Sequence, residues 1–126
     1  MKGLRVFIVE DEAILLCDLE DMVTHMGLQI VGSATSLDQA IKLVSSGLEI
    51  DVALLDMNLN GESSDPVADL LLEKGAGLLF VSGYGRHGLS DRFSDCHVLQ
   101  KPYDETPHPD PQPYPTRHLA LAGQRE

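Results

Sequence analysis

The chain has 126 residues, with 9 Lys and Arg against 20 Asp and Glu, and a formal net charge of −11. This length suits one domain, and the negative charge argues against direct binding to nucleic acid or to anionic membranes, which carry phosphate groups. No apolar run is long enough to predict a membrane span. Cys17 and Cys96 form no disulfide framework, and Met1–Leu4 shows no signal-peptide profile, so we expect a cytoplasmic protein with reduced thiols.

The first half of the chain alternates short apolar runs with amphipathic segments. The apolar runs predict strands over Leu4–Glu10, Gln29–Ser33 and Asp51–Leu55. The segment Glu12–Met26 has apolar side chains three and four residues apart, which indicates a helix. A second helix begins after Ser36, which is spaced from Gln39 as in a capping box, and stops at Gly47.

The second half continues the alternation. A loop over residues 57–64 precedes Asp65-Pro66, which we interpret as the N-cap and first-turn proline of a helix that runs to about Lys74. Strands are expected at Leu78–Val81 and His97–Gln100, with a short helix at Leu89–Asp95 between them. Alternating strands and helices with short connections predict an α/β fold with a doubly wound parallel sheet.

The composition changes near Thr106. Alternating prolines from Pro107 to Pro115 exclude a helix there. We therefore assign residues 1–104 to the folded domain and residues 105–126 to a Pro-rich tail that is extended or disordered.

Polar side chains follow the ends of the apolar strands. Glu10 and Asp11 follow the first strand, Asp56 the third, Ser82 the fourth and Lys101 the fifth. Because the carboxyl ends of parallel strands meet at one edge of a sheet, we expect these side chains to converge. Clustered carboxylates repel one another, and a magnesium ion with oxygen ligands removes that repulsion. The ion, the Lys101 ammonium and the Ser82 hydroxyl are then suited to stabilising a phosphoryl group at Asp56.

These residues, in this order, resemble the receiver domain of two-component response regulators, and the likeness covers residues 3–104. The resemblance implies a flavodoxin-like five-stranded parallel sheet in the order 2-1-3-4-5. It implies that Asp56 accepts a phosphoryl group from the phosphohistidine of a histidine kinase or phosphotransfer protein. It also implies Mg²⁺ binding by Asp11, Asp56 and the backbone carbonyl of Asn58, with Glu10 contributing through water. Ser82 is then the switch hydroxyl, and Lys101 contacts the phosphoryl group ahead of a cis Pro102.

A narrower resemblance is carried by the stretch Phe80–Gly85. It is similar to the Phe-Ala-Thr-Gly-Tyr-Gly stretch of stand-alone receivers from alphaproteobacteria, with Val81 and Ser82 in place of Ala and Thr, and Asn58–Ser63 also fits that subgroup. Many receivers carry an aromatic switch residue three positions before the lysine, where this chain has Val98. Tyr84 is therefore the substitute switch candidate.

The C-terminal segment departs from the receiver pattern. Receivers continue with a fifth amphipathic helix, whereas Asp104–Pro107 breaks that pattern, so we expect a missing or atypical fifth helix. Without this helix an apolar face of the sheet would be exposed. Its area would be of the size typical of interaction patches. Our hypothesis is that another protomer, in a homodimer, or the tail segment His118–Ala122 covers this face.

The resulting functional expectation is a single-domain response regulator that signals through a downstream protein or serves as a phosphate relay or sink. It would catalyse only its own phosphorylation and dephosphorylation, and would not be an enzyme with an external substrate. Aspartyl-phosphate phosphatases need an acid two residues beyond the nucleophile, where Asn58 stands. The alternative is a pseudo-receiver used for assembly or dimerisation and not switched by phosphorylation. A nucleotide-binding flavodoxin-like domain is disfavoured because acids replace a phosphate-binding loop.

Overall fold

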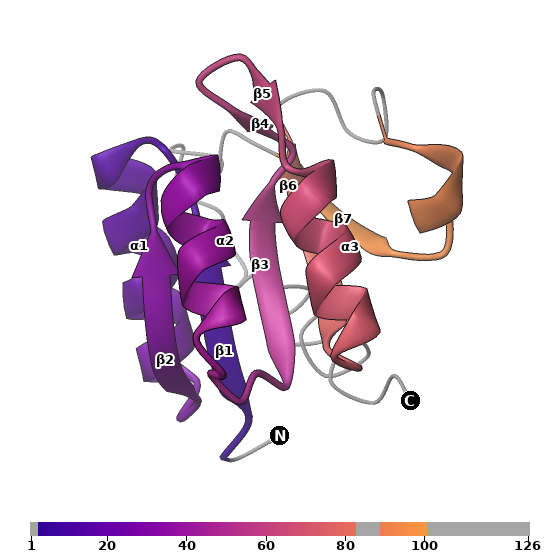
Figure 1. The fold of residues 1–126 in the computed structure, drawn as a ribbon. Helices are drawn as coiled ribbons and strands as arrows, with labels where there is room; N and C mark the ends of the chain where they lie inside the picture. Colours follow the sequence, from indigo (N-terminus) through magenta and orange to yellow (C-terminus); the bar gives the residue numbers. More distant parts are fainter. Residues whose placement is uncertain (1–2, 83–88, 101–126) are drawn as a thin grey trace.

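The computed structural model describes residues 3–82 and 89–100. Five parallel strands form one sheet in the order β2-β1-β3-β6-β7 (Figure 1). The strands of this sheet are β1 (Arg5–Val9), β2 (Gln29–Ala34), β3 (Val52–Asp56), β6 (Gly77–Ser82) and β7 (His97–Gln100). Their arrangement confirms the flavodoxin-like order 2-1-3-4-5 that the receiver resemblance implied.

Within the described residues, three helices and one 3₁₀ turn connect the strands. They are α1 (Ala13–His25), α2 (Leu37–Ser45), α3 (Asp65–Glu73) and η1 (Asp91–Phe93). Helices α2 and α3 cover one face of the sheet, and α1 covers the other (Figure 1). Strands β3 and β6 are buried along their whole length, as expected for central parallel strands with helices on both faces.

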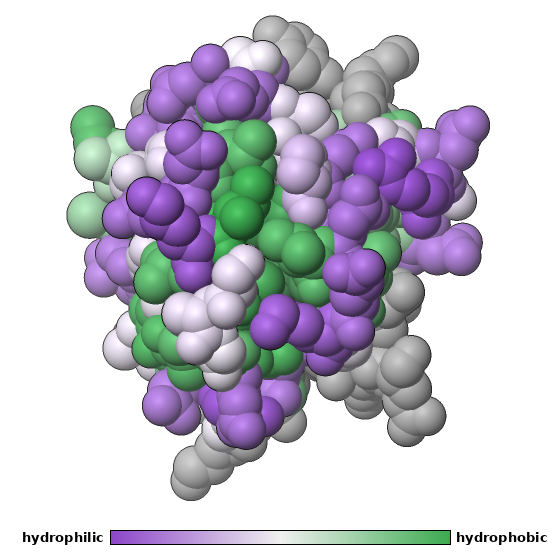
Figure 2. All heavy atoms as spheres, viewed as in Figure 1, coloured by the Kyte–Doolittle hydropathy of each residue, from purple (hydrophilic) through white to green (hydrophobic). Residues whose placement is uncertain are grey.

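The core has one apolar cluster on each side of the sheet. Phe7, Phe80 and Phe93 belong to the larger cluster, under α2 and α3, while Leu19 and Val23 of α1 belong to the smaller one. Figure 2 shows apolar surface reaching solvent along the seam between α2 and α3, bordered by polar side chains. Half-buried apolar residues of α2 and α3 pack against the larger cluster and leave part of their surface exposed. They include Leu37, Ile41 and Leu70.

Two helix starts differ in detail from the sequence expectation. Ser36 caps α2 by accepting a hydrogen bond from the Gln39 N–H at 3.2 Å. The Gln39 side-chain oxygen accepts its bond from the N–H of Thr35 at 2.8 Å, whereas a capping box would use the N–H of the cap residue Ser36. The N-cap of α3 is Ser64, so the assignment of Asp65 as the cap was wrong by one residue. The Asp65 N–H is instead satisfied by the Ser63 hydroxyl at 3.1 Å.

The segment between β6 and β7 forms less helix than the sequence predicted. Of the expected helix over Leu89–Asp95, only the single 3₁₀ turn η1 is present. Ser and Asp side chains in this segment compete with helical hydrogen bonds, which favours one short turn over a helix. Phe93 anchors the turn, because it is fully buried and its ring lies 5.4 Å from that of Phe80.

A second difference is the hairpin that follows β3. Strands β4 (Asn58–Leu59) and β5 (Glu62–Ser63) pair antiparallel where the sequence analysis expected an irregular loop. The hairpin projects beyond the sheet edge at which β3 ends (Figure 1). The tip residues Asn60 and Gly61 have φ values of 54° and 88°, a pattern of two positive angles that an Asn-Gly turn favours.

Three apolar residues on the sheet face expected to lose cover without a fifth helix are buried. Leu79 and Val81 of β6 and Leu99 of β7 each have 0% exposure. The expected apolar exposure is therefore not found among these residues. Residues 101–126, which include the predicted tail, lie outside the described residues.

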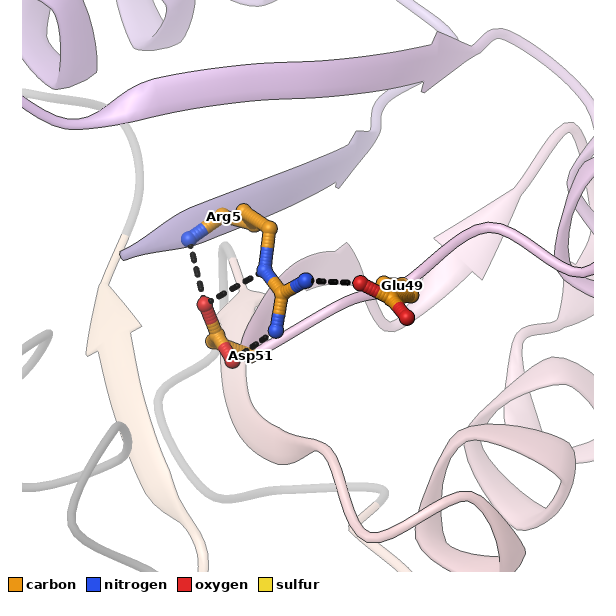
Figure 3. Close-up of polar contacts among 3 residues, drawn as sticks. All are labelled: Arg5, Glu49 and Asp51. Carbon is orange, nitrogen blue, oxygen red and sulfur yellow. Dashed lines mark hydrogen bonds and ion pairs between the residues drawn. The ribbon is translucent and has the colours of Figure 1, made fainter. Parts of the chain in front are cut away.

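The amino edge of the sheet, opposite the ends of β1 and β3 that carry the acids, is held by a charged cluster (Figure 3). The Arg5 guanidinium donates from Nε to Asp51 Oδ2 and from Nη2 to Asp51 Oδ1, both at 3.0 Å, and a third nitrogen pairs with Glu49. Asp51 Oδ2 also accepts the Arg5 backbone N–H at 2.7 Å. These bonds fix the start of β1 against the start of β3.

We predict that the Arg5–Asp51 contact makes stability depend on pH. Hydrogen bonds from the Arg5 side chain and backbone hold the pKa of Asp51 below its ordinary value. Because the native pKa is lowered, the stabilisation is complete above the ordinary carboxyl pKa of about 3.9 and is lost as the pH falls through the native value. Asp51→Asn should lower the free energy of unfolding by about 1 kcal/mol at pH 7.

Urea unfolding at neutral pH and below pH 4 measures this difference. The difference in free energy of unfolding between wild type and Asp51→Asn should become smaller as the pH falls. Asp21→Asn, an equal charge change at an exposed position of α1, is the control. A difference in free energy of unfolding that stays constant over the pH range would contradict a contribution of the Asp51 charge to stability.

Candidate functional site

The carboxyl ends of β1 and β3 bring three acids together. Val9 of β1 pairs with Leu55 of β3, so the residues that follow them, Glu10 and Asp56, lie at the same edge. Carboxylate oxygens of Glu10, Asp11 and Asp56 lie within 4.8 Å of one another. Glu10 and Asp56 are 0% and 5% exposed, while Asp11 is half-buried. The sequence-predicted acids are therefore brought together, largely out of solvent.

Each acid in this cluster accepts a hydrogen bond from a backbone N–H. Glu10 Oε2 accepts from Glu12 at 3.1 Å, Asp56 Oδ1 from Asn58 at 3.1 Å, and Asp11 Oδ2 from Asn60 at 3.0 Å. Desolvation raises the pKa of Asp11, but hydrogen bonds shared with Glu10 and Asp56 and the bond from Asn60 outweigh it, so the pKa of Asp11 lies below its ordinary value. The side-chain hydrogen bonds with Glu10 and Asp56 contribute most to this lowering of the pKa, and the Asn60 N–H adds to it.

This donor set fits a small hard cation. Two like charges about 4 Å apart repel by roughly 4 kcal/mol at an effective dielectric constant of 20, which a divalent cation converts into attraction. Octahedral Mg²⁺ with bonds of about 2.1 Å spaces its ligands roughly 3 to 4 Å apart, close to the span of the cluster. Water molecules would supply the remaining ligands of such a shell.

The structure places Ser82 at the same edge of the sheet as the acids. Val81 of β6 pairs with Asp56, and Ser82 follows it at the end of the strand with 4% exposure. Lys101 and Tyr84 lie outside the described residues. Val98, at the position where an aromatic switch residue was sought, is half-buried on β7 and pairs with Phe80.

The backbone of Asn58 faces the acids. Met57 and Ser64 are joined by a hydrogen bond of 3.2 Å at the base of the hairpin, so the next pair, Asn58 and Ser63, is a non-hydrogen-bonded pair. The N–H of Asn58 then points outward, and it meets Asp56. In a strand the N–H and C=O of one residue point to the same side, so the carbonyl of Asn58 also faces outward, toward the side of the acids.

Sequence reasoning missed one contributor, the Asn60 N–H that binds Asp11. The Asn60-Gly61 pair was a usable signal, because this dipeptide is typical of a two-residue hairpin turn. The strands it joins are only two residues long each, too short for alternation of apolar and polar side chains to appear.

In the described residues no helix is long and apolar enough to cross a membrane. This finding covers residues 3–82 and 89–100 alone.

Comparison with known proteins identifies the family. No protein-family model matches the chain. Among curated proteins, it is 30% identical over 102 residues to the phyllosphere-induced regulator PhyR of Methylorubrum extorquens, covering 79% of this chain and 38% of PhyR. It is 25% identical over 96 residues to the transcriptional regulatory protein PdtaR of Mycobacterium tuberculosis, covering 75% and 46%. The chain thus spans less than half the length of these two relatives.

Solved structures match over nearly the whole chain. SdrG from Sphingomonas melonis Fr1 is 32% identical, with a TM-score of 0.73 and coverage of 95% of this chain and 92% of that one. A response regulator receiver protein from Sinorhizobium medicae WSM419 has the same fold, at 24% identity and a TM-score of 0.73, with 98% of each chain covered. The fold, the order of the acids and these relatives together show that the chain belongs to the receiver domain family of response regulators.

Proposed function

We propose that this receiver domain accepts a phosphoryl group on Asp56 from the phosphohistidine of a histidine kinase or phosphotransfer protein, with Mg²⁺ bound beside it. The observation that carries the proposal is the convergence of Glu10, Asp11 and Asp56, with oxygens within 4.8 Å of one another. A solved structure described as the BeF3-activated conformation of SdrG, 32% identical to this chain, supports activation at such a site.

The transfer assigned to Asp56 is a single displacement at phosphorus. A carboxylate oxygen of Asp56 forms the new P–O bond while the P–N bond to the donor imidazole breaks, and the imidazole nitrogen keeps the electron pair. Asp56 is nearly buried, and its Oδ1 is held by the Asn58 N–H, so the nucleophile is oriented before the donor arrives. The products are an acyl phosphate on Asp56 and the dephosphorylated histidine of the donor protein.

Other residues around Asp56 are assigned cation binding, contacts to the phosphoryl group and the switch. Asp11, Asp56 and the Asn58 carbonyl would hold the cation, with Glu10 acting through water. Bound Mg²⁺ supplies positive charge that neutralises the acids and the phosphoryl oxygens. The Ser82 hydroxyl, at the end of β6, is assigned a hydrogen bond to a phosphoryl oxygen, and Lys101 a second positive charge. Ser82 and Tyr84 are the residues we expect to report the phosphorylated state.

The readout is proposed to be a protein contact. A solved PhyR from Bartonella quintana, 25% identical over 82% of this chain, is described as an anti-anti-sigma factor, which names a protein-directed function. A net charge of −11 favours a basic protein surface over nucleic acid as the target. A relay or sink role, a cytoplasmic location and a homodimer through the face expected to lack a fifth helix remain predictions of the sequence.

Incubation with acetyl phosphate and MgCl₂ tests the proposal. The wild-type chain should gain the mass of one phosphoryl group, and addition of EDTA should prevent it, because the acids alone repel a phosphate donor. Borohydride reduction followed by peptide mapping should place the label at Asp56. Absence of label, or label at another residue, would favour the pseudo-receiver alternative, an assembly module not switched by phosphorylation.

A further inference from the structure

Asp11 is the most exposed acid of the cluster. It is half-buried, whereas Glu10 and Asp56 are almost fully buried. It lies between the end of β1 and the start of α1, outside any helix or strand. Repulsion among three close carboxylates therefore acts most effectively on Asp11, which has solvent to move into. A cation site that uses Asp11 needs something to keep this side chain near Asp56.

The tip of the β4–β5 hairpin makes that contact. The Asn60 N–H donates to Asp11 Oδ2 at 3.0 Å, across 49 positions of sequence. Two residues earlier, at the start of β4, the Asn58 N–H donates to Asp56 Oδ1 at 3.1 Å. One hairpin edge thus supplies one N–H to an acid from the β1 end and one to the acid of β3. Both carboxylates are therefore bonded to the same hairpin.

The shape of the tip depends on an unusual backbone. Asn60 and Gly61 have φ values of 54° and 88°, and Gly61 donates its N–H to the Asn58 side-chain oxygen at 2.7 Å. Positive φ at both central residues directs the Asn60 N–H toward Asp11 while the chain reverses. Glycine takes such angles at little cost, and Asn tolerates them better than most residues that carry a Cβ.

We propose that the Asn60-Gly61 turn is a positioning element of the cation site, which holds Asp11 at the distance from Asp56 that Mg²⁺ needs. Asn60 acts through its backbone N–H and not as a cation ligand. This inference rests on the proposed function, because it concerns the same site. It accounts for a two-stranded hairpin at a place where a connection from β3 to α3 needs none.

Gly61→Ala is a direct probe of the turn. A Cβ built at Gly61 meets no atom within 4 Å, so the substitution acts only through the φ of 88°. Gly47→Ala is the matched control: its φ is 94°, its Cβ also meets nothing within 4 Å, and it lies beyond the end of α2 at the opposite edge of the sheet. Both variants should lose similar stability in thermal unfolding followed by circular dichroism.

Titration of the full chain with MgCl₂, followed by amide NMR shifts, separates the two variants. Gly61→Ala should raise the dissociation constant for Mg²⁺ about tenfold, the usual effect of losing an outer contact to a metal ligand. Gly47→Ala should leave it unchanged. Equal affinities in Gly61→Ala and Gly47→Ala would overturn the positioning role while leaving the proposed function intact. Absence of saturable Mg²⁺ binding in the wild type would overturn the proposed function, and this inference with it.

A second measurement on the wild type needs no variant. Hydrogen exchange at the Asn60 amide should be slowed by its bond to Asp11, and slowed further when MgCl₂ fixes Asp11. An Asn60 amide that exchanges at the unprotected rate with and without MgCl₂ would contradict the contact on which the proposal depends.

Discussion

Asp56→Asn should abolish phosphoryl incorporation from acetyl phosphate, leaving no label detectable by intact mass. The change keeps the size of the side chain and its ability to accept the Asn58 N–H at Oδ1. It removes the anionic oxygen that forms the P–O bond, and a carboxamide oxygen is a poor nucleophile at neutral pH. Glu10 is no substitute, because its side chain is fully buried beside Asp56.

The matched control is Asp21→Asn, which removes the same charge from an exposed position on α1. It should label as fast as wild type, which shows that the loss in Asp56→Asn is not a general effect of net charge. Asp56→Asn should also unfold at a higher urea concentration than wild type without MgCl₂, because one of three repelling carboxylates is gone. Persistent label in the variant would move the acceptor to another residue.

The main sheet was predictable because its central strands are buried on both faces. Val52–Asp56 and Gly77–Ser82 are fully buried, and a strand of that kind appears in a sequence as an unbroken apolar run. Polar residues directly after such runs mark the edge where parallel strands end. That single rule placed Glu10, Asp11, Asp56 and Ser82 at one edge of the sheet.

Local details failed where short-range hydrogen bonds decide the structure. The N-cap of α3 is Ser64, yet the hydroxyl that accepts the Asp65 N–H belongs to Ser63. Because Ser and Asp are all favoured N-cap residues, the sequence alone does not distinguish among these three adjacent positions. The bond from Asn60 to Asp11 joins residues 49 positions apart and uses a backbone donor. A contact of that kind carries no side-chain signature in the sequence.

Phe93→Ala should lower the free energy of unfolding by about 3–5 kcal/mol, the usual cost of truncating a fully buried aromatic side chain. Phe93 is 0% exposed and packs against Phe80, with ring centroids 5.4 Å apart and planes at 51°. It is the buried residue of η1, so its loss also removes the anchor of the segment that leads into β7. A small domain has only about 5–15 kcal/mol of stability, so this variant should be marginally folded.

Urea unfolding of two further variants distinguishes the buried anchor from the charged contacts beside it. Phe93→Leu keeps most of the apolar volume and should recover more than half of the loss. Arg92→Ala removes an exposed guanidinium that bonds Asp69 at 2.9 and 3.0 Å and lies 4.8 Å from the centre of the Phe93 ring. Exposed ion pairs and cation–π contacts each contribute about 1 kcal/mol or less, so Arg92→Ala should cost well under half of Phe93→Ala. Equal losses in Arg92→Ala and Phe93→Ala would mean that the surface ion pairs, and not the buried ring, hold η1 against α3.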